Sequence, residues 1–193
     1  IMARGDGVFV YDETGERFFE GMSWLWCTSL GFSESELIGA AIDQFNKLPF
    51  YHSFAGKTVD PAIELAEILI KHAPPAAGGS KMSKVFFAAS GSEANDTAMK
   101  MVWYYNAALG RPEKRKIISR KKGYHGVTIA AASMTALAYA QDGGGLPLDW
   151  VKHTMAADYY NGALPDESED QFASRCADEL EEWIVEEGGG RGG

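Results

Sequence analysis

Val85-Phe86-Phe87-Ala88 leads directly into Ala89-Ser90-Gly91-Ser92-Glu93-Ala94-Asn95-Asp96, and these residues indicate the class of fold. The short apolar run is typical of a buried strand, and Ser90-Gly91-Ser92 interrupts it. The pattern from Glu93 to Leu109 predicts a helix, and 116–119 predicts the next strand. A strand–helix–strand series of this kind predicts an α/β fold with a mostly parallel sheet flanked by helices.

Further elements are expected on both sides of this unit. Towards the C-terminus the patterns predict a helix, a strand and an acidic helix, at 127–139, 151–155 and 170–187. Near the N-terminus, 8–11 and 17–19 flank a short turn that contains glycine, and they predict a β-hairpin.

Two helices are predicted between the hairpin and the central strand. Ser33 is expected to be the N-cap of the first, with Glu36 completing a capping box, and Pro49 ends this helix. The second is expected to begin at Asp60-Pro61, because proline suits the first position of a helix.

We divide the chain into three parts on these patterns. The first, at 1–57, is an α+β segment, and 58–187 is the first part of a larger α/β domain. The glycine-rich end at 188–193 is interpreted as a truncation or a linker. The sheet is incomplete within this chain, because a parallel sheet needs several strands with both faces covered.

Composition excludes several classes of protein. The 193 residues correspond to roughly 1.3 domains, and 46% hydrophobic with 12% aromatic residues favours a globular protein. No apolar run approaches the about 20 residues that cross a bilayer, and the net charge of −9 argues against nucleic-acid binding. Cys27 and Cys176 lack metal-like spacing, and no signal peptide is visible at the start, so we expect a cytoplasmic protein without a metal site.

The first candidate site is Ser90-Gly91-Ser92, between a predicted strand and a predicted helix. Free N–H groups and the helix dipole at such a helix start favour an anion. Gly91 lets a phosphate approach the backbone, and the Ser92 hydroxyl can add a hydrogen bond. The alternative, a plain capped helix start after a glycine turn, explains the residues equally well.

The second candidate site is Gly123-Tyr124-His125-Gly126, which follows the second predicted strand. This loop is expected at the same edge of the sheet as Gly91, where α/β sheets bind ligands. The Tyr124 ring could stack on a planar ligand. Taken alone, the loop is better explained as a surface turn with a half-buried tyrosine.

Together the motifs resemble the class III (ω-) aminotransferases, which depend on pyridoxal phosphate (PLP) and have the type I fold of PLP-dependent transferases. The resemblance covers about residues 7–187 and is most similar to the branch of ω-amino acid:pyruvate and amine:pyruvate transaminases. It rests on five motifs in the family's order: Leu25-Trp26-Cys27, Leu48-Pro49-Phe50-Tyr51, the 90–96 motif, Gly110-Arg111-Pro112-Glu113-Lys114 and Gly123-Tyr124-His125-Gly126.

The resemblance implies roles for individual residues. It implies cofactor binding by five of them: Ser90, Gly91, Ser92, Tyr124 and His125. Among these, Gly91 and Ser92 match the phosphate-holding positions, Tyr124 matches the ring stacked on the pyridine, and His125 is expected to order the Tyr124 loop. Trp26, Phe54 and Tyr124 are implied to bind substrate, with Phe54 acting across a dimer interface.

Two departures from the family pattern matter. Family members commonly have glycine or another small residue where this chain has Trp24, which puts the shape of the substrate pocket in doubt. Family members are also more than twice as long, and their Schiff-base lysine matches a region beyond residue 193. We therefore assign no catalytic residue in this chain, since Lys100, Lys121, Lys122 and Lys152 do not match the motif.

The implied function is transfer of an amino group from an amine or ω-amino acid to a keto acid such as pyruvate, by a ping-pong Schiff-base mechanism in a homodimer with shared active sites. An aminomutase or a decarboxylase of the same fold is the first alternative. The second is a non-catalytic, truncated module that binds a phosphate ligand or mediates dimerisation.

Overall fold

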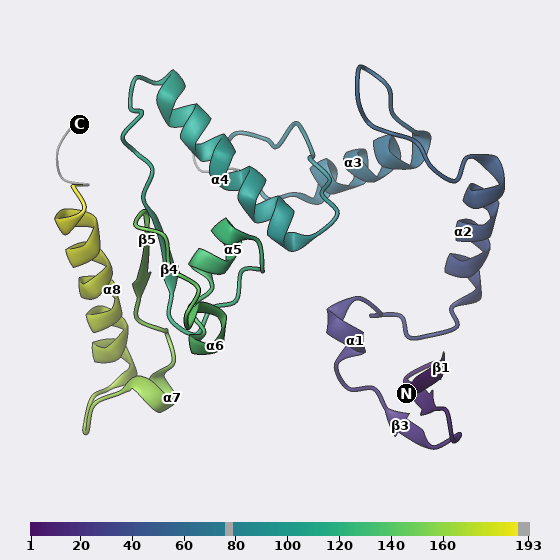
Figure 1. Ribbon diagram of the computed structural model, residues 1–193, viewed down its shortest axis with the longest axis horizontal. Helices are drawn as coiled ribbons and strands as arrows, with labels where there is room; N and C mark the ends of the chain where they lie inside the picture. Colours follow the sequence, from purple (N-terminus) through teal and green to yellow (C-terminus); the bar gives the residue numbers. More distant parts are fainter. Residues whose placement is uncertain (76–78, 189–193) are drawn as a thin grey trace. The chain divides into compact units, whose positions relative to one another are not determined.

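The computed structural model describes residues 1–75 and 79–188 (Figure 1). Within it the chain separates into two compact units, 1–85 and 86–193, with 76–78 and 189–193 outside the described residues. The predicted glycine-rich end therefore lies outside the described residues except for Gly188. The predicted boundary at 57 remains a prediction.

The first unit contains a three-stranded antiparallel sheet in the order β1 (Met2–Asp6), β2 (Phe9–Asp12) and β3 (Arg17–Phe19). The predicted hairpin corresponds to β2 and β3, whereas β1 was not predicted. The Asp12 side chain organises the turn, because Oδ1 accepts hydrogen bonds from the Thr14 and Glu16 N–H groups at 2.9 Å each. A hydrogen bond from the Thr14 side chain, with others from the turn backbone, lowers the pKa of the Asp12 carboxyl.

Three helices follow in the first unit: α1 (Ser23–Trp26), α2 (Ser35–Lys47) and α3 (Asp60–His72). The predicted capping box of α2 is wrong, because Glu34 occupies the N-cap position. Ser33 instead has a φ of 65°, and its hydroxyl donates to the Gly5 carbonyl at 2.8 Å. The cap of α3 was expected at Asp60 and lies one residue earlier, at Val59, so Asp60 is the first helical residue and the proline lies in the first turn.

The second unit is built around two parallel strands, β4 (Ile117–Arg120) and β5 (Val151–Thr154), paired from Ile117 opposite Val151 to Arg120 opposite Thr154. Adjacent residues of β5 point to opposite faces of the sheet. Lys152 pairs with Glu187, at the end of α8 (Glu169–Glu186), at 2.9 Å, whereas His153 lies 2.9 Å from the Ser133 carbonyl in α5 (Ile129–Met134). Helices α5 and α8 therefore cover opposite faces of the two strands (Figure 1).

Helix α4 (Gly91–Ala108) packs on α5, and two short helices, α6 (Ala138–Gln141) and α7 (Tyr159–Gly162), complete the unit. The small core is formed where α5 meets α4 and β5, and it consists of Met99, Ala131, Met134 and Val151. Among the described residues no helix combines the length and apolarity needed to cross a bilayer. The structure confirms a mixed α/β architecture with a small antiparallel sheet and parallel strands.

Two predicted elements of the second unit are wrong. The run 85–88 forms no strand, because no strand within the described residues pairs with it, and a strand needs a hydrogen-bonded partner. The predicted helix at 127–139 is two helices, α5 and α6, with Thr135 extended between them. The break occurs because Ala136 N–H donates to the Gly123 carbonyl at 2.9 Å instead of continuing the helix.

A charged fork closes the loop before α8. Both nitrogens Nε and Nη2 of Arg175 donate to the Glu167 carboxylate at 2.7 Å, and Nη2 also reaches the Gly162 carbonyl at 2.9 Å. The Glu167 side chain is 9% exposed, and the guanidinium lowers the pKa of its carboxyl to about 2. Bidentate arginine–carboxylate pairs combine charge with fixed geometry.

This fork predicts a pH-dependent contribution to stability. Because the folded-state pKa lies below the unfolded value, the contribution is complete above the unfolded pKa of about 4.3 and is lost as the pH falls towards about 2. We expect Glu167→Gln to lower the melting temperature at pH 7, and the gap from wild type to close between pH 4.5 and 2. A gap that stays constant over this range, measured by circular dichroism, would contradict the assignment.

Candidate functional site

The start of α4 carries the first candidate site. The Ser90 side chain accepts the Glu93 N–H at 3.2 Å, and the Glu93 carboxylate accepts the Ala89 N–H at 2.9 Å. Ser90 is thus the N-cap, and α4 begins at Gly91, two residues before the start predicted at Glu93. Within the described part of the chain no acceptor engages the N–H groups of Gly91 and Ser92. These two donors, at the positive end of an 18-residue helix, are available to an anion.

Gly91 opens onto free space. A Cβ atom built at this position would meet nothing within 4 Å, so packing within the described residues does not require glycine here. The absence of a side chain and of neighbours beside the Gly91 Cα atom leaves the backbone there accessible to a phosphate. Glycine at position 91 is therefore better explained by access for a ligand than by packing within the fold.

The Ser92 hydroxyl joins the start of α4 to the tyrosine loop. Its oxygen accepts the Val127 N–H at 3.0 Å, which leaves the hydroxyl proton free to donate. Gly126 passes directly over this side chain with a φ of 130°, and a Cβ there would collide with Ser92 Oγ and lie 2.9 Å from the Ala131 methyl. In contrast to Gly91, glycine at 126 is required by the fold.

Side chains from α4 fix the segment that follows the tyrosine. Asn95 Nδ2 donates to the His125 carbonyl at 2.7 Å. Asp96 Oδ1 accepts the Thr128 hydroxyl at 2.8 Å and the Ala131 N–H at 3.2 Å, so it caps the start of α5 from outside that helix. The structure therefore brings together the two loops that the sequence placed at one edge of the sheet.

Tyr124 and His125 differ in their surroundings. The Tyr124 side chain is 60% exposed, so its ring is accessible to a planar ligand. His125 is half-buried, and its backbone N–H and carbonyl are both hydrogen-bonded. The prediction that His125 orders the loop is consistent with these bonds, although they involve its backbone rather than its imidazole.

The predicted substrate residues lie in the first unit. Trp26 and Phe54 are both largely exposed. The backbone around Trp26 is unusual: Ser23, Trp24 and Trp26 all have positive φ, with Trp24 at 56°. Such conformations are costly for bulky residues and concentrate at functional sites. Glycine, which is one of the residues expected at position 24, would relieve this strain because it has no Cβ atom.

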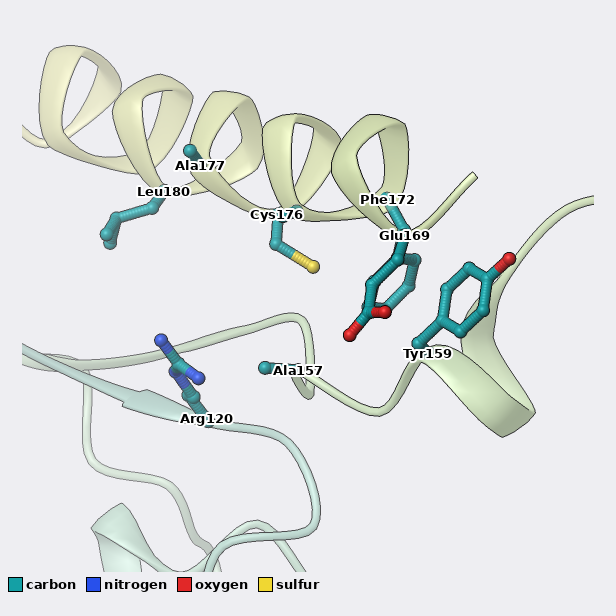
Figure 2. A pocket seen from close by; sticks show the side chains of 9 residues that line it. Arg120, Ala157, Tyr159, Glu169, Phe172, Cys176, Ala177 and Leu180 are labelled. Carbon is teal, nitrogen blue, oxygen red and sulfur yellow. The ribbon is translucent and has the colours of Figure 1, made fainter. Parts of the chain in front are cut away.

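A hollow of about 320 Å³ lies elsewhere in the second unit, between α8 and the end of β4 (Figure 2). Figure 2 shows Arg120 opposite Leu180 and Cys176 of α8, with Phe172, Glu169 and Tyr159 together at one end. None of the predicted cofactor or substrate residues line this hollow. The candidate site is therefore the start of α4 and the 123–128 loop.

The residues at this site fit pyridoxal phosphate. Two free N–H groups, the free proton of Ser92 and the open space at Gly91 suit the phosphate. The accessible Tyr124 ring suits the pyridine.

A helix start with two free N–H groups, held against an exposed tyrosine loop in a mixed α/β unit, is an arrangement that suits a phosphate-bearing ligand. The chain matches the family model for aminotransferase class III over residues 1–189. The protein belongs to the class III aminotransferase family.

Similar proteins agree with this family. A probable gamma-aminobutyrate transaminase 2, mitochondrial, of Oryza sativa subsp. indica is 48% identical over 97% of this chain and 37% of its own length. The crystal structure of the omega transaminase from Pseudomonas jessenii in complex with PMP is 54% identical with a TM-score of 0.92, over 97% of this chain and 40% of that chain. A transaminase structure with L-ala is 50% identical with a TM-score of 0.92, covering 97% and 43%. The chain thus spans about two fifths of the length of these proteins.

Three residues of the site were missed by the sequence reasoning: Asn95, Asp96 and Thr135. Asn95 and Asp96 lie within the quoted motif, and their position one turn after Ser92 on the same helix was the available signal. Thr135 gave no signal, because its hydroxyl acts on a loop that the sequence cannot place beside it.

Proposed function

We propose that the protein is a PLP-dependent aminotransferase that moves an amino group from an amine or ω-amino acid to a keto acid such as pyruvate, by a ping-pong Schiff-base mechanism. The observation that carries the proposal is the start of α4, where Gly91 and Ser92 offer free donors beside the Tyr124 loop. Its family is PLP-dependent, and a similar structure holds PMP.

The chain's own residues bind and orient the cofactor in this proposal. The N–H groups of Gly91 and Ser92 and the Ser92 hydroxyl hold the phosphate, Ser90 keeps the helix start in place, and Tyr124 stacks on the ring. When bound, pyridoxal phosphate supplies the carbonyl that captures the amine and the conjugated ring that accepts electrons from the substrate carbon. The lysine that completes this chemistry is proposed to lie outside these 193 residues.

The substrate side of the proposal rests on aromatic residues and on the similar proteins. Trp26 and Phe54 are proposed to form apolar walls for the donor, with Phe54 acting across a homodimer interface. The gamma-aminobutyrate relative supports an ω-amino acid donor, and the transaminase structure with L-ala supports the alanine–pyruvate pair. A cytoplasmic location also remains a proposal.

Borohydride trapping tests cofactor attachment. The purified protein is incubated with pyridoxal phosphate and reduced, and its intact mass is measured. We expect one pyridoxyl phosphate adduct per chain, on a polypeptide more than twice the 21.0 kDa of these residues. A mass near 21.0 kDa without a specific adduct would contradict the catalytic proposal and favour the binding-module alternative.

Product analysis separates the transaminase from the alternatives on the same fold. With an amine donor and pyruvate, a transaminase forms alanine and the carbonyl product in equal amounts. A decarboxylase releases carbon dioxide and an aminomutase forms an isomer of its substrate, and neither needs pyruvate. Turnover without alanine would therefore contradict the proposed reaction while leaving the cofactor assignment in place.

A further inference from the structure

We propose that Thr135 and Asn95 are positioning residues for Tyr124, which fix its backbone and so determine where its ring meets the cofactor. This inference rests on the proposed function, because it concerns the ring that is proposed to stack on pyridoxal phosphate. It adds two residues that lie outside the phosphate-binding and stacking positions.

No hydrogen bond of its own holds the Tyr124 side chain in place. It is 60% exposed, and no hydrogen bond to its hydroxyl occurs among the described residues. For such an exposed ring, the two backbone torsions at the Cα atom fix the direction of the Cα–Cβ bond, and with it the positions that the staggered χ1 rotamers can place the ring in. The orientation of Tyr124 therefore depends on what holds its two flanking peptide groups.

Both flanking peptide groups are held by residues 135 and 136. The Gly123 carbonyl, in the peptide before Tyr124, accepts the Ala136 N–H at 2.9 Å. The His125 N–H, in the peptide after Tyr124, donates to Thr135 Oγ1 at 2.8 Å. One extended dipeptide thus fixes the chain on either side of the tyrosine, and α5 ends at Met134 where this dipeptide begins.

Thr135 is well suited to hold this position rigidly. It is fully buried, and its hydroxyl proton has two acceptors at 3.2 Å, the Gly126 and Ala131 carbonyls. The oxygen is therefore held in place while it accepts the His125 N–H. Removing the hydroxyl would leave the half-buried His125 N–H without its partner, and a donor that loses its partner away from water is unfavourable.

Asn95 connects the same loop to α4, the helix whose start is proposed to bind the phosphate. Its amide donates to the His125 carbonyl at 2.7 Å from a position one turn after Ser92 on α4. The loop that carries Tyr124 and the N–H groups proposed to hold the phosphate are therefore held in one arrangement before any ligand binds. Such preorganisation raises affinity because less ordering is needed on binding.

The test compares Thr135→Val, which keeps the shape but loses the hydroxyl, with Thr135→Ser, which keeps the hydroxyl. We measure the dissociation constant of pyridoxal phosphate by absorbance titration of the cofactor-free protein. We also measure the dissociation constant of inorganic phosphate by competition. Thr135→Val is expected to weaken pyridoxal phosphate about tenfold, as the loss of one buried hydrogen bond implies, and to leave inorganic phosphate unchanged. Thr135→Ser is expected to bind both ligands like wild type.

Ser119→Ala is the matched control. The Ser119 hydroxyl is also buried, and it donates to the Met134 carbonyl at 2.8 Å, next to Thr135 but without contact to the tyrosine loop. The Ser119→Ala variant loses a comparable hydrogen bond from the same core. It is therefore expected to have lower stability but an unchanged affinity for pyridoxal phosphate. Equal affinity losses in Ser119→Ala and Thr135→Val would overturn the proposal.

Other results also decide the question. A parallel loss of inorganic phosphate binding, or a Thr135→Ser variant as weak as Thr135→Val, would overturn the positioning role. If Thr135→Val does not fold, Asn95→Ala is judged by the same criteria. A wild-type protein that shows no saturable binding of pyridoxal phosphate would overturn the proposed function itself, and this result is distinct from the others.

Discussion

Replacing Gly126 by alanine is expected to destabilise the second unit by about 3 kcal/mol, the sum of a strained backbone and an overpacked contact. The φ of 130° is unfavourable for any side chain, and the new methyl would collide with Ser92 Oγ and press on Ala131. Because Ser92 must move, pyridoxal phosphate binding is expected to be lost together with stability. Urea unfolding and a cofactor titration measure the two effects.

Gly110→Ala is the control for this substitution. Gly110 also has a positive φ, 74°, but a Cβ there would meet nothing within 4 Å. It should therefore cost only the backbone term, about 1 kcal/mol, and leave cofactor affinity unchanged. Equal losses in both variants would show that backbone strain alone, rather than the contact with Ser92, makes glycine necessary at 126.

The contrast between Gly91 and Gly126 shows what the sequence can predict. The motif was sufficient to predict a helix start next to Ser90-Gly91-Ser92, although α4 begins at Gly91 and not at Glu93, because capping and anion binding are local properties of a helix end. The requirement for glycine at 126 depends on Ser92, which belongs to another element. That requirement is a tertiary contact, and no local pattern reveals it.

The two wrong elements have the same cause. The apolar run at 85–88 predicts a buried strand, but Phe86 and Phe87 are exposed, and no described strand pairs with the run. The alanine-rich pattern of 127–139 favours a helix, but Thr135 and Ala136 bond to the tyrosine loop instead. The first element lacks a pairing partner and the second is broken by hydrogen bonds to another loop, so both outcomes depend on parts of the chain that local propensity does not describe.

The family resemblance supplied what physical patterns alone left open. Until the five motifs were taken together, the residues around Ser90 could be explained as a capped helix start and the Tyr124 loop as a surface turn. The structure adds that Gly91 is open, that Ser92 keeps a free proton and that the tyrosine loop is fastened to α4. These observations support the proposal that a phosphate and a flat ring bind side by side at this site.

Gly91→Asp should separate folding from ligand binding more sharply than any other substitution. The aspartate has space for its side chain, and a carboxylate in the first turn of α4 interacts favourably with the helix dipole by about 0.3–1 kcal/mol. Stability should therefore stay the same or rise. The same carboxylate would occupy the place proposed for a phosphate that carries about −1.5 to −2 charges near pH 7. We expect pyridoxal phosphate affinity to fall at least about 100-fold, or about 2.7 kcal/mol.

Gly91→Asn isolates the charge, because asparagine has the same shape as aspartate without the carboxylate. It should weaken pyridoxal phosphate by only about tenfold, through lost space and a competing amide, and its affinity should be less sensitive to salt. Pyridoxal without its phosphate gives a further comparison, since it should distinguish poorly between the aspartate and asparagine variants. If Gly91→Asp binds pyridoxal phosphate as tightly as wild type while remaining folded, the phosphate does not lie at the start of α4, and the cofactor assignment for Gly91 and Ser92 is wrong.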